Sequence, residues 1–287
     1  MWIFFAFGSA IFAGITAILA KCGMKNMDTN VATALRTIVV LLFSWLMVLI
    51  SGKIGTIYEL NGKTWFFLIT SGLATGISWL CYFRALQLGD VNKVTPIDKS
   101  STVLTMLLAF IFLGEKLTIL KAAAMLLIGA GTFLMITKTS GTKEKEQLQN
   151  GWIIFAFAST IFASLTAILG KIGMQGVDSN LGTAIRTVVV LIMAWIVVFV
   201  TGKQHTVKNT NATNWVFLIF SGIATGTSWL CYYRALQLGD ASVVVPIDKL
   251  SILITIAFSF LVFKEKLNKK SSVGLISIVA GTLLLLF

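Results

Sequence analysis

Apolar residues along the chain gather in ten long runs that are separated by short polar segments. Each run has about the 20 residues that a helix needs to cross the hydrocarbon core of a bilayer. None shows the strict alternation that is typical of a transmembrane β-barrel. The pattern therefore predicts an all-α membrane protein with ten transmembrane helices. The predicted spans are residues 2–21, 31–51, 64–86, 91–113, 119–137, 152–171, 181–201, 214–236, 241–263 and 271–287.

The chain also repeats itself at an offset of 150 residues. Segment 71–90 (SGLATGISWLCYFRALQLGD) and segment 221–240 (SGIATGTSWLCYYRALQLGD) agree at 17 of 20 positions. A polar, charged stretch at 139–150 separates the two copies and has the composition of a linker. We therefore predict a first five-helix repeat at 1–138 and a second at 151–287.

The number of spans in each repeat determines how the two copies sit in the membrane. Because five is odd, the second copy must enter the bilayer from the opposite face, so the repeats are expected to be inverted. Inverted repeats are the architecture of many secondary transporters, which bind substrate near the membrane midplane between the two halves. The pattern thus predicts two inverted five-helix repeats and favours a transporter.

Composition agrees with a membrane location. The chain has 287 residues, is 57% hydrophobic, has a mean hydropathy of +0.91 and is only 12% charged, which leaves too little polar surface for a soluble protein. The net charge of +12 suits anionic lipid head groups, while nucleic-acid binding would need a soluble basic face. We expect a multi-pass protein of the cell membrane, with the lipid bilayer as a partner.

Metal and cofactor chemistry has little support in the sequence. The three cysteines lack CxxC spacing, and His205 is the only histidine. A zinc site or a histidine-assisted nucleophile needs several such residues together. We predict no metal site, no cofactor and no enzymatic activity.

The only two prolines occupy matching positions inside apolar runs. Pro96 lies in VTPIDKSS and Pro246 in VVPIDKLS. Proline lacks the backbone donor and clashes with the carbonyl four residues back, so we expect an opened or kinked turn before each one. Interrupted spans at corresponding places of two repeats indicate the binding site of a transporter.

Four charged residues follow the prolines, well inside the predicted spans: Asp98, Lys99, Asp248 and Lys249. A charge at the bilayer centre costs at least about 2.5 to 3.5 kcal/mol, so each should face a partner or water. We expect Asp98 to pair with Lys249, and Lys99 with Asp248, across the two halves. Two interpretations remain open. The ions either hold the structure together, with lysines reaching the interface, or line a cavity and exchange partners with substrate or protons.

Arginines and aromatic residues supply further candidates for such a site. Arg36 and Arg186 lie early in the second and seventh spans. Each could extend to the lipid head groups or hold a carboxylate or phosphate with its planar guanidinium.

The aromatic candidates are Trp79, Tyr82, Trp229 and Tyr232, late in the third and eighth spans. They are consistent either with the aromatic belt at the membrane interface or with stacking against a substrate.

Together these residues resemble a known family. Arg36, Tyr82 before Ala85-Leu86, Pro96 and GEKL at 114–117 follow the order found in the EamA-type branch of the drug/metabolite transporter superfamily. The second half repeats them as Arg186, Tyr232, Pro246 and KEKL at 264–267. The family often has an acidic residue directly before the proline, whereas this chain has Thr95 and Val245 there. The substrate site of the family therefore cannot be carried over.

The resemblance implies a central cavity, alternating access and cytoplasmic termini. The distribution of Lys and Arg among the predicted loops instead favours an N-terminus outside the cytoplasm, so the orientation stays open.

The predicted function is that of a secondary transporter, in particular an exporter, of a small polar or amphipathic metabolite such as an amino acid or another organic anion or zwitterion. The chain has no GxxxxGK[ST] motif, so we expect an ion or substrate gradient to supply the energy. Asp98 and Asp248 are the candidate proton carriers.

Two alternatives remain: a flippase of lipid head groups or polyprenyl phosphates with the same fold, and an intramembrane aspartyl enzyme. The lysine after each aspartate disfavours the enzyme. The protein could be a monomer or a homodimer.

Overall fold

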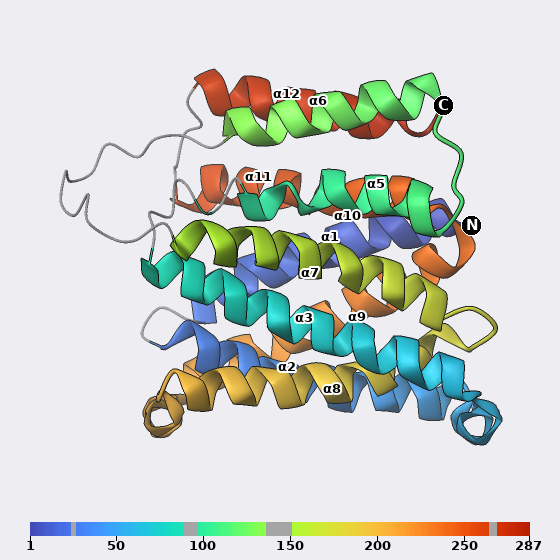
Figure 1. Cartoon of the computed structure of the whole chain (residues 1–287). Coiled ribbons are helices and arrows are strands. Elements are labelled where there is room, and N and C mark those ends of the chain that lie inside the picture. Colours follow the sequence, from blue (N-terminus) through green and yellow to red (C-terminus); the bar gives the residue numbers. More distant parts are fainter. Residues whose placement is uncertain (24–26, 89–93, 95–96, 136–150, 264–268) are drawn as a thin grey trace.

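The computed structural model describes residues 1–23, 27–88, 94, 97–135, 151–263 and 269–287. All regular elements in these ranges are helices (Figure 1). The first half contains α1 (Trp2–Gly23), α2 (Thr29–Ile50), the 3-10 helix η1 (Ile54–Glu59), α3 (Gly62–Leu88), α5 (Ser101–Phe112) and α6 (Ile119–Met135). The second half contains α7 (Gly151–Gly173), α8 (Ser179–Val200), η2 (Gln204–Asn209), α9 (Ala212–Leu238), α10 (Ala241–Lys249), α11 (Ser251–Phe263) and α12 (Lys269–Leu284).

The helices confirm a multi-pass, all-α membrane protein. Seven described segments are long and apolar enough to span a bilayer, and one of these joins α10 to α11. Helix α6 is apolar but shorter. Predicted spans 91–113 and 241–263 are not single uninterrupted helices in the described residues, because turns at Ser100 and Leu250 divide them.

Helices of the two halves pack mainly against each other. Helix α3 lies against α7 and α8, and α9 lies against α1 and α2. At two edges of the molecule, α6 packs on α12 and α2 packs on α8 (Figure 1). The interior is therefore built jointly by both repeats.

Small residues allow these helices to approach closely. A Cβ atom on Gly72 would lie 2.7 Å from Cβ of Val189, and one on Gly222 would lie 2.6 Å from Cβ of Val39. Such glycines let helix backbones meet in a membrane, where tight packing and not the hydrophobic effect drives association. These glycines allow α3 to pack on α8, and α9 to pack on α2, through corresponding residues of the two halves.

Helices α2 and α8 begin at matching aspartates. Oδ1 of Asp28 accepts hydrogen bonds from the second and third backbone N–H groups of α2, and Asp178 does the same for α8. These N-caps satisfy donors that the helix leaves unpaired. They fix the start of each helix about two turns before Arg36 and Arg186.

The helix break in the second half lies after the proline, not before it. Helix α10 continues through Pro246 and ends at Lys249, and Leu250 forms the turn to α11. The turn before Pro246 is thus helical and not opened, so that part of the prediction was wrong. Within α10 the proline removes one donor, and the remaining hydrogen bonds are sufficient to keep the helix. Pro96 lies outside the described residues, but Ser100 forms the turn that matches Leu250.

Candidate functional site

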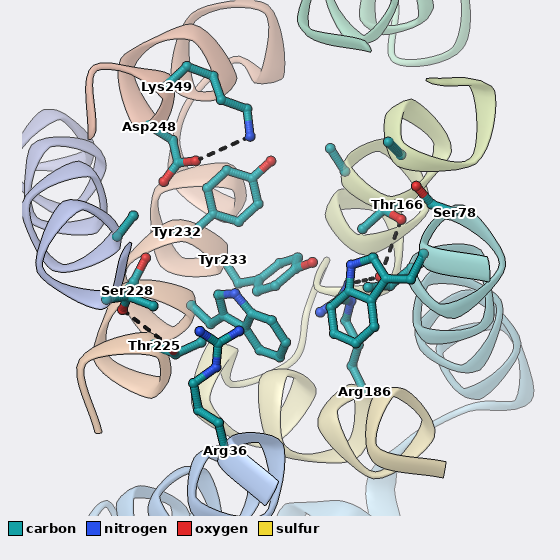
Figure 2. A pocket seen from close by; sticks show the side chains of 17 residues that line it. Arg36, Ser78, Thr166, Arg186, Thr225, Ser228, Tyr232, Tyr233, Asp248 and Lys249 are labelled. Atoms are coloured by element: carbon teal, nitrogen blue, oxygen red, sulfur yellow. Dashed lines mark hydrogen bonds and ion pairs between the residues drawn. The ribbon is translucent and has the colours of Figure 1, made fainter. Parts of the chain in front are cut away.

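A cavity of about 380 Å³ lies between the two halves (Figure 2). Its described walls come from α1, α2, α3, α7, α8, α9 and α10. Seven of the residues singled out in the sequence line it: Arg36, Arg186, Trp79, Trp229, Tyr232, Asp248 and Lys249.

Arg186 is buried in the wall of this cavity, with only 2% of its surface exposed. Nε donates to Oγ of Ser71 at 2.9 Å, and Nη2 donates to Oγ1 of Thr75 at 2.5 Å. The guanidinium carbon also lies 4.6 Å from the ring centre of Tyr233 and 5.6 Å from that of Trp229. The side chain thus faces the protein interior and does not extend to lipid head groups.

Arg186 has no counter-ion among its described hydrogen-bonding partners. Both hydrogen-bonding partners are neutral hydroxyls, so among the described residues no carboxylate is bonded to it. A buried charge without a counter-ion is costly, whereas the two aromatic faces give partial electrostatic compensation. This environment can hold an anion beside the guanidinium.

Arg36, the matching residue of the first half, extends from α2 toward the same cavity (Figure 2). It is half-buried. Within the described part of the chain no hydrogen bond to its guanidinium is found. Its donors are therefore available to a ligand.

Asp248 lies across the cavity from the arginines (Figure 2). Its Oδ1 accepts a hydrogen bond from Oγ of Ser9 at 2.5 Å, and its Oδ2 lies 3.8 Å from Nζ of Lys249. Ser9 in turn lies 3.2 Å from the hydroxyl of Ser228. The carboxylate of the second half is thus held by a hydroxyl of the first.

Asp98 has the matching arrangement. Its Oδ1 accepts from Oγ of Ser159 at 2.9 Å, and that hydroxyl lies 3.3 Å from Oγ of Ser78. Each aspartate therefore contacts the opposite half, but through a serine. Among the described residues no ion pair joins Asp98 to Lys249 or Lys99 to Asp248, so the predicted pairing is not found; Asp248 instead lies 3.8 Å from its neighbour Lys249.

The two lysines remain accessible even though they lie within spans. Half of the Lys249 side chain, 52%, is exposed, and it borders the cavity. Lys99 is exposed as well. An exposed ammonium at this depth is stable only where water or a ligand solvates it.

Hydroxyl groups of α7 satisfy carbonyls at the break of the first half. Oγ1 of Thr160 donates to the carbonyl of Ile97 at 2.5 Å, and Oγ of Ser164 donates to that of Ser101 at 3.0 Å. Backbone carbonyls in a membrane must find such partners. The broken helix of the first repeat is thereby bonded to the second repeat.

Four of the described site residues do not line the cavity: Asp98, Lys99, Tyr82 and Pro246. Tyr82 belongs to an apolar cluster with Ala85, Val94 and Ala156, not to the described cavity wall. Pro96 is not among the described residues.

Sequence reasoning also missed some lining residues. Tyr233 was not predicted because its counterpart is Phe83, which carries no polar group. The hydroxyls of Thr75 and Ser78 were missed too, although Ser and Thr recur at helical spacing on α3 and again, 150 residues later, on α9. That repeated spacing of small polar residues inside an apolar span was the available signal.

Comparison with known proteins gives a consistent result. A curated relative from Sinorhizobium sp., an uncharacterized transporter in the cobO 3' region, is 44% identical over 134 residues. These cover 47% of this chain and 95% of the relative, which is thus about as long as one repeat. Human solute carrier family 35 member G1 is 27% identical over 207 residues, or 69% of this chain and 56% of that protein.

A solved crystal structure of a protein superposes with a TM-score of 0.76 at 16% identity, and covers 98% of this chain and 94% of its own. At that identity the likeness concerns the fold alone. The model of the EamA-like transporter family matches residues 1–137 and 150–287, which is nearly the whole chain. The chain therefore belongs to the EamA-like transporter family, and is a multi-pass membrane transporter of the drug/metabolite transporter superfamily.

Proposed function

We propose that the protein is a secondary transporter that exports a small organic anion or zwitterion, with amino acids as the leading class. Transport proceeds by alternating access of two inverted repeats of five spans each. The observation that carries the substrate class is Arg186, a buried guanidinium whose described hydrogen-bonding partners are all neutral.

Three observations support the inverted arrangement. Five predicted spans in each copy require opposite insertion of the second copy. In Figure 1, α1 runs leftward from the labelled N-terminus, whereas α7, the matching helix, runs rightward. Equivalent contacts also recur with the halves exchanged: α3 meets α7 and α8, while α9 meets α1 and α2. A pseudo-two-fold axis in the membrane plane explains all three.

The charges of the cavity favour an anionic or zwitterionic ligand. Among the described lining residues, Arg36, Arg186 and Lys249 are cationic and Asp248 is anionic. A carboxylate can take both donors of a guanidinium in a bidentate contact. A ligand amine could be accepted by Asp248. Trp79 and Trp229 add aromatic surface on which an apolar side chain can pack.

Protons are the proposed coupling ion. Asp98 and Asp248 lie at matching positions beside the helix breaks, and each is bonded to a serine of the other half. Protonation would remove the charge that holds Ser9 or Ser159, and a moving carboxylate could then release its partner. This gives a direct connection between proton binding and the contact between repeats.

Counterflow in liposomes tests the proposal. Vesicles loaded with unlabelled amino acids should accumulate labelled amino acid from outside, and Arg186→Lys should reduce this uptake because lysine keeps the charge but loses the planar fork. Arg234→Lys, the same change at a position that does not line the cavity and that bonds to Gln237, is the control. Movement of labelled phospholipid in place of any metabolite would overturn the proposal in favour of a flippase.

A further inference from the structure

A second group of charges lies away from the central cavity and centres on Glu115. This residue follows α5, at the end of the molecule where α7 also ends and where α6 and α10 begin (Figure 1). Its side chain is only 5% exposed. One carboxylate oxygen accepts from Nζ of Lys171 at 3.1 Å and from the backbone N–H of Ala241 at 2.6 Å. The other accepts from the N–H of Ser242 at 3.0 Å.

Glu115 thereby caps a helix that belongs to the other repeat. The residue at the N-cap position of α10 is Asp240, and its own side chain makes no capping hydrogen bond. The unpaired donors of a helix N-terminus favour a carboxylate. The first repeat supplies that carboxylate to the second.

Lys171 and Lys121 complete the connection. Nζ of Lys171 also donates to the carbonyl of Gly239 at 2.6 Å, and Nζ of Lys121 lies 2.7 Å from Oδ2 of Asp240. The Glu115–Lys171 pair is buried on both sides, whereas Asp240 is 52% exposed. Separating the buried pair without replacement partners would be costly.

Helix α10 joins this group to the central cavity. Asp248 is seven residues after Ala241, which corresponds to about 10 Å along a helix. A displacement of the N-terminus of α10 would therefore move Asp248 and Lys249 with it. The contacts of Glu115 restrain the same helix that carries the ionic residues of the cavity.

We propose that Glu115, Lys171 and the N-terminus of α10 form the closed gate of the cavity at this end, and that this end opens when Glu115 releases α10. Glu115 is a positioning residue in this scheme, because it acts on the cavity through α10. The inference rests on the proposed alternating access, since a gate has meaning only for a cavity that opens in turn to each side.

Thiol labelling can test the gate without knowledge of the substrate. Cys22, Cys81 and Cys231 are first replaced by alanine, and a reporter cysteine is introduced at Ala163, which lines the cavity. A charged, membrane-impermeant thiol reagent is applied to either side of sealed vesicles. A second reporter, Lys116→Cys, is exposed near Glu115 and identifies the side on which the gate lies.

From the gate side, Ala163→Cys should react slowly in the parent and at least about tenfold faster with Glu115→Gln, because the buried pair is lost and the open state gains population. Lys171→Met removes the same ion pair and should act in the same direction, which covers the case that Glu115→Gln does not fold. Glu59→Gln, the same change at an exposed glutamate of η1 that does not line the cavity, should leave the rate from the gate side unchanged.

The outcomes separate the two proposals. Equal gate-side rates in the parent and in folded Glu115→Gln and Lys171→Met would overturn the gate while leaving the cavity intact. Failure of Ala163→Cys to react from either side in every variant would mean that no water-filled cavity exists, and the transport mechanism itself would fall. Elution of each variant as a single species in detergent verifies folding.

Discussion

The two arginines of the cavity occupy matching positions of a duplicated sequence but have different surroundings. Arg186 is almost fully buried and donates to Ser71 and Thr75. Arg36 is half-buried and has no hydrogen bond to another residue in the described ranges. The hydroxyl residues do not explain this difference, because the first-half arginine has counterparts of Ser71 and Thr75 available. These counterparts are Ser221 and Thr225 on α9.

Matching hydroxyls are present on both sides. Ser71 and Thr75 bond to Thr166 of α7, and Ser221 and Thr225 bond in the same way to Thr16 of α1. Of the two arginines, only Arg186 also donates hydrogen bonds to its pair of hydroxyls, those of Ser71 and Thr75. Under the proposed alternating access, the opposite conformation would exchange the roles of the two arginines. One sequence difference lies beside Arg186, because Tyr233, whose ring centre is 4.6 Å from the guanidinium carbon, corresponds to Phe83 in the first half.

Substitution of the two aspartates should have the largest effect on transport. It also tests a site at which the two halves should behave alike. Asp98 and Asp248 each accept from one serine of the other half. Because each loses a charge-assisted contact, Asp98→Asn and Asp248→Asn should each lower counterflow by about 100-fold. Melting temperatures should stay near that of the parent, since asparagine keeps the acceptor oxygen. A large loss of stability in either variant would instead assign the aspartates to holding the structure together.

The arginines should behave differently from each other. Arg186→Lys breaks two hydrogen bonds and the aromatic contacts, and should lower the free energy of unfolding by about 2 to 3 kcal/mol. Arg36→Lys breaks none with a described residue and should change it by less than about 0.5 kcal/mol. Denaturant titration in detergent measures both values. Equal losses would remove the distinction between the two arginines.

Alanine substitutions at two matching positions, Ser164 and Gly14, compare the two halves next to their helix breaks. Ser164 donates to the carbonyl of Ser101, whereas its counterpart Gly14 packs directly on α11, where a Cβ would lie 2.6 Å from Cβ of Ile254. Gly14→Ala should cost about 1 to 3 kcal/mol through overpacking. Ser164→Ala should cost about 1 kcal/mol through a lost hydrogen bond. The thermal unfolding temperatures give the order, and a reversed order would contradict these roles.

The exposed ion pair at the gate should have the smallest effect. Lys121 and Asp240 are 2.7 Å apart, but half of the aspartate side chain is accessible. Lys121→Met should therefore lower stability by no more than about 1 kcal/mol, and less at high salt. Urea titration at two salt concentrations checks this. A loss as large as that of Lys171→Met would show that burial does not separate the two pairs.

Much of the fold could be predicted from the sequence, because long apolar runs and an exact repeat offset are strong signals. The position of the helix break could not, since Pro246 removes a single donor and α10 tolerates the loss. The hydrogen-bonding partners of the aspartates could not be predicted from the sequence either. Ser9 and Ser159 contact them only because α1 and α7 pack beside the broken helices, and that packing depends on the tertiary structure.

Cross-repeat packing has a consequence for synthesis. Helices α1, α3 and α6 each pack on a helix of the second half, and Glu115 caps α10 across the same boundary. At ordinary translation rates the second half takes on the order of 10 s to appear. During that interval the helices of the first half are in the bilayer without their partners, so insertion and final assembly are separate events.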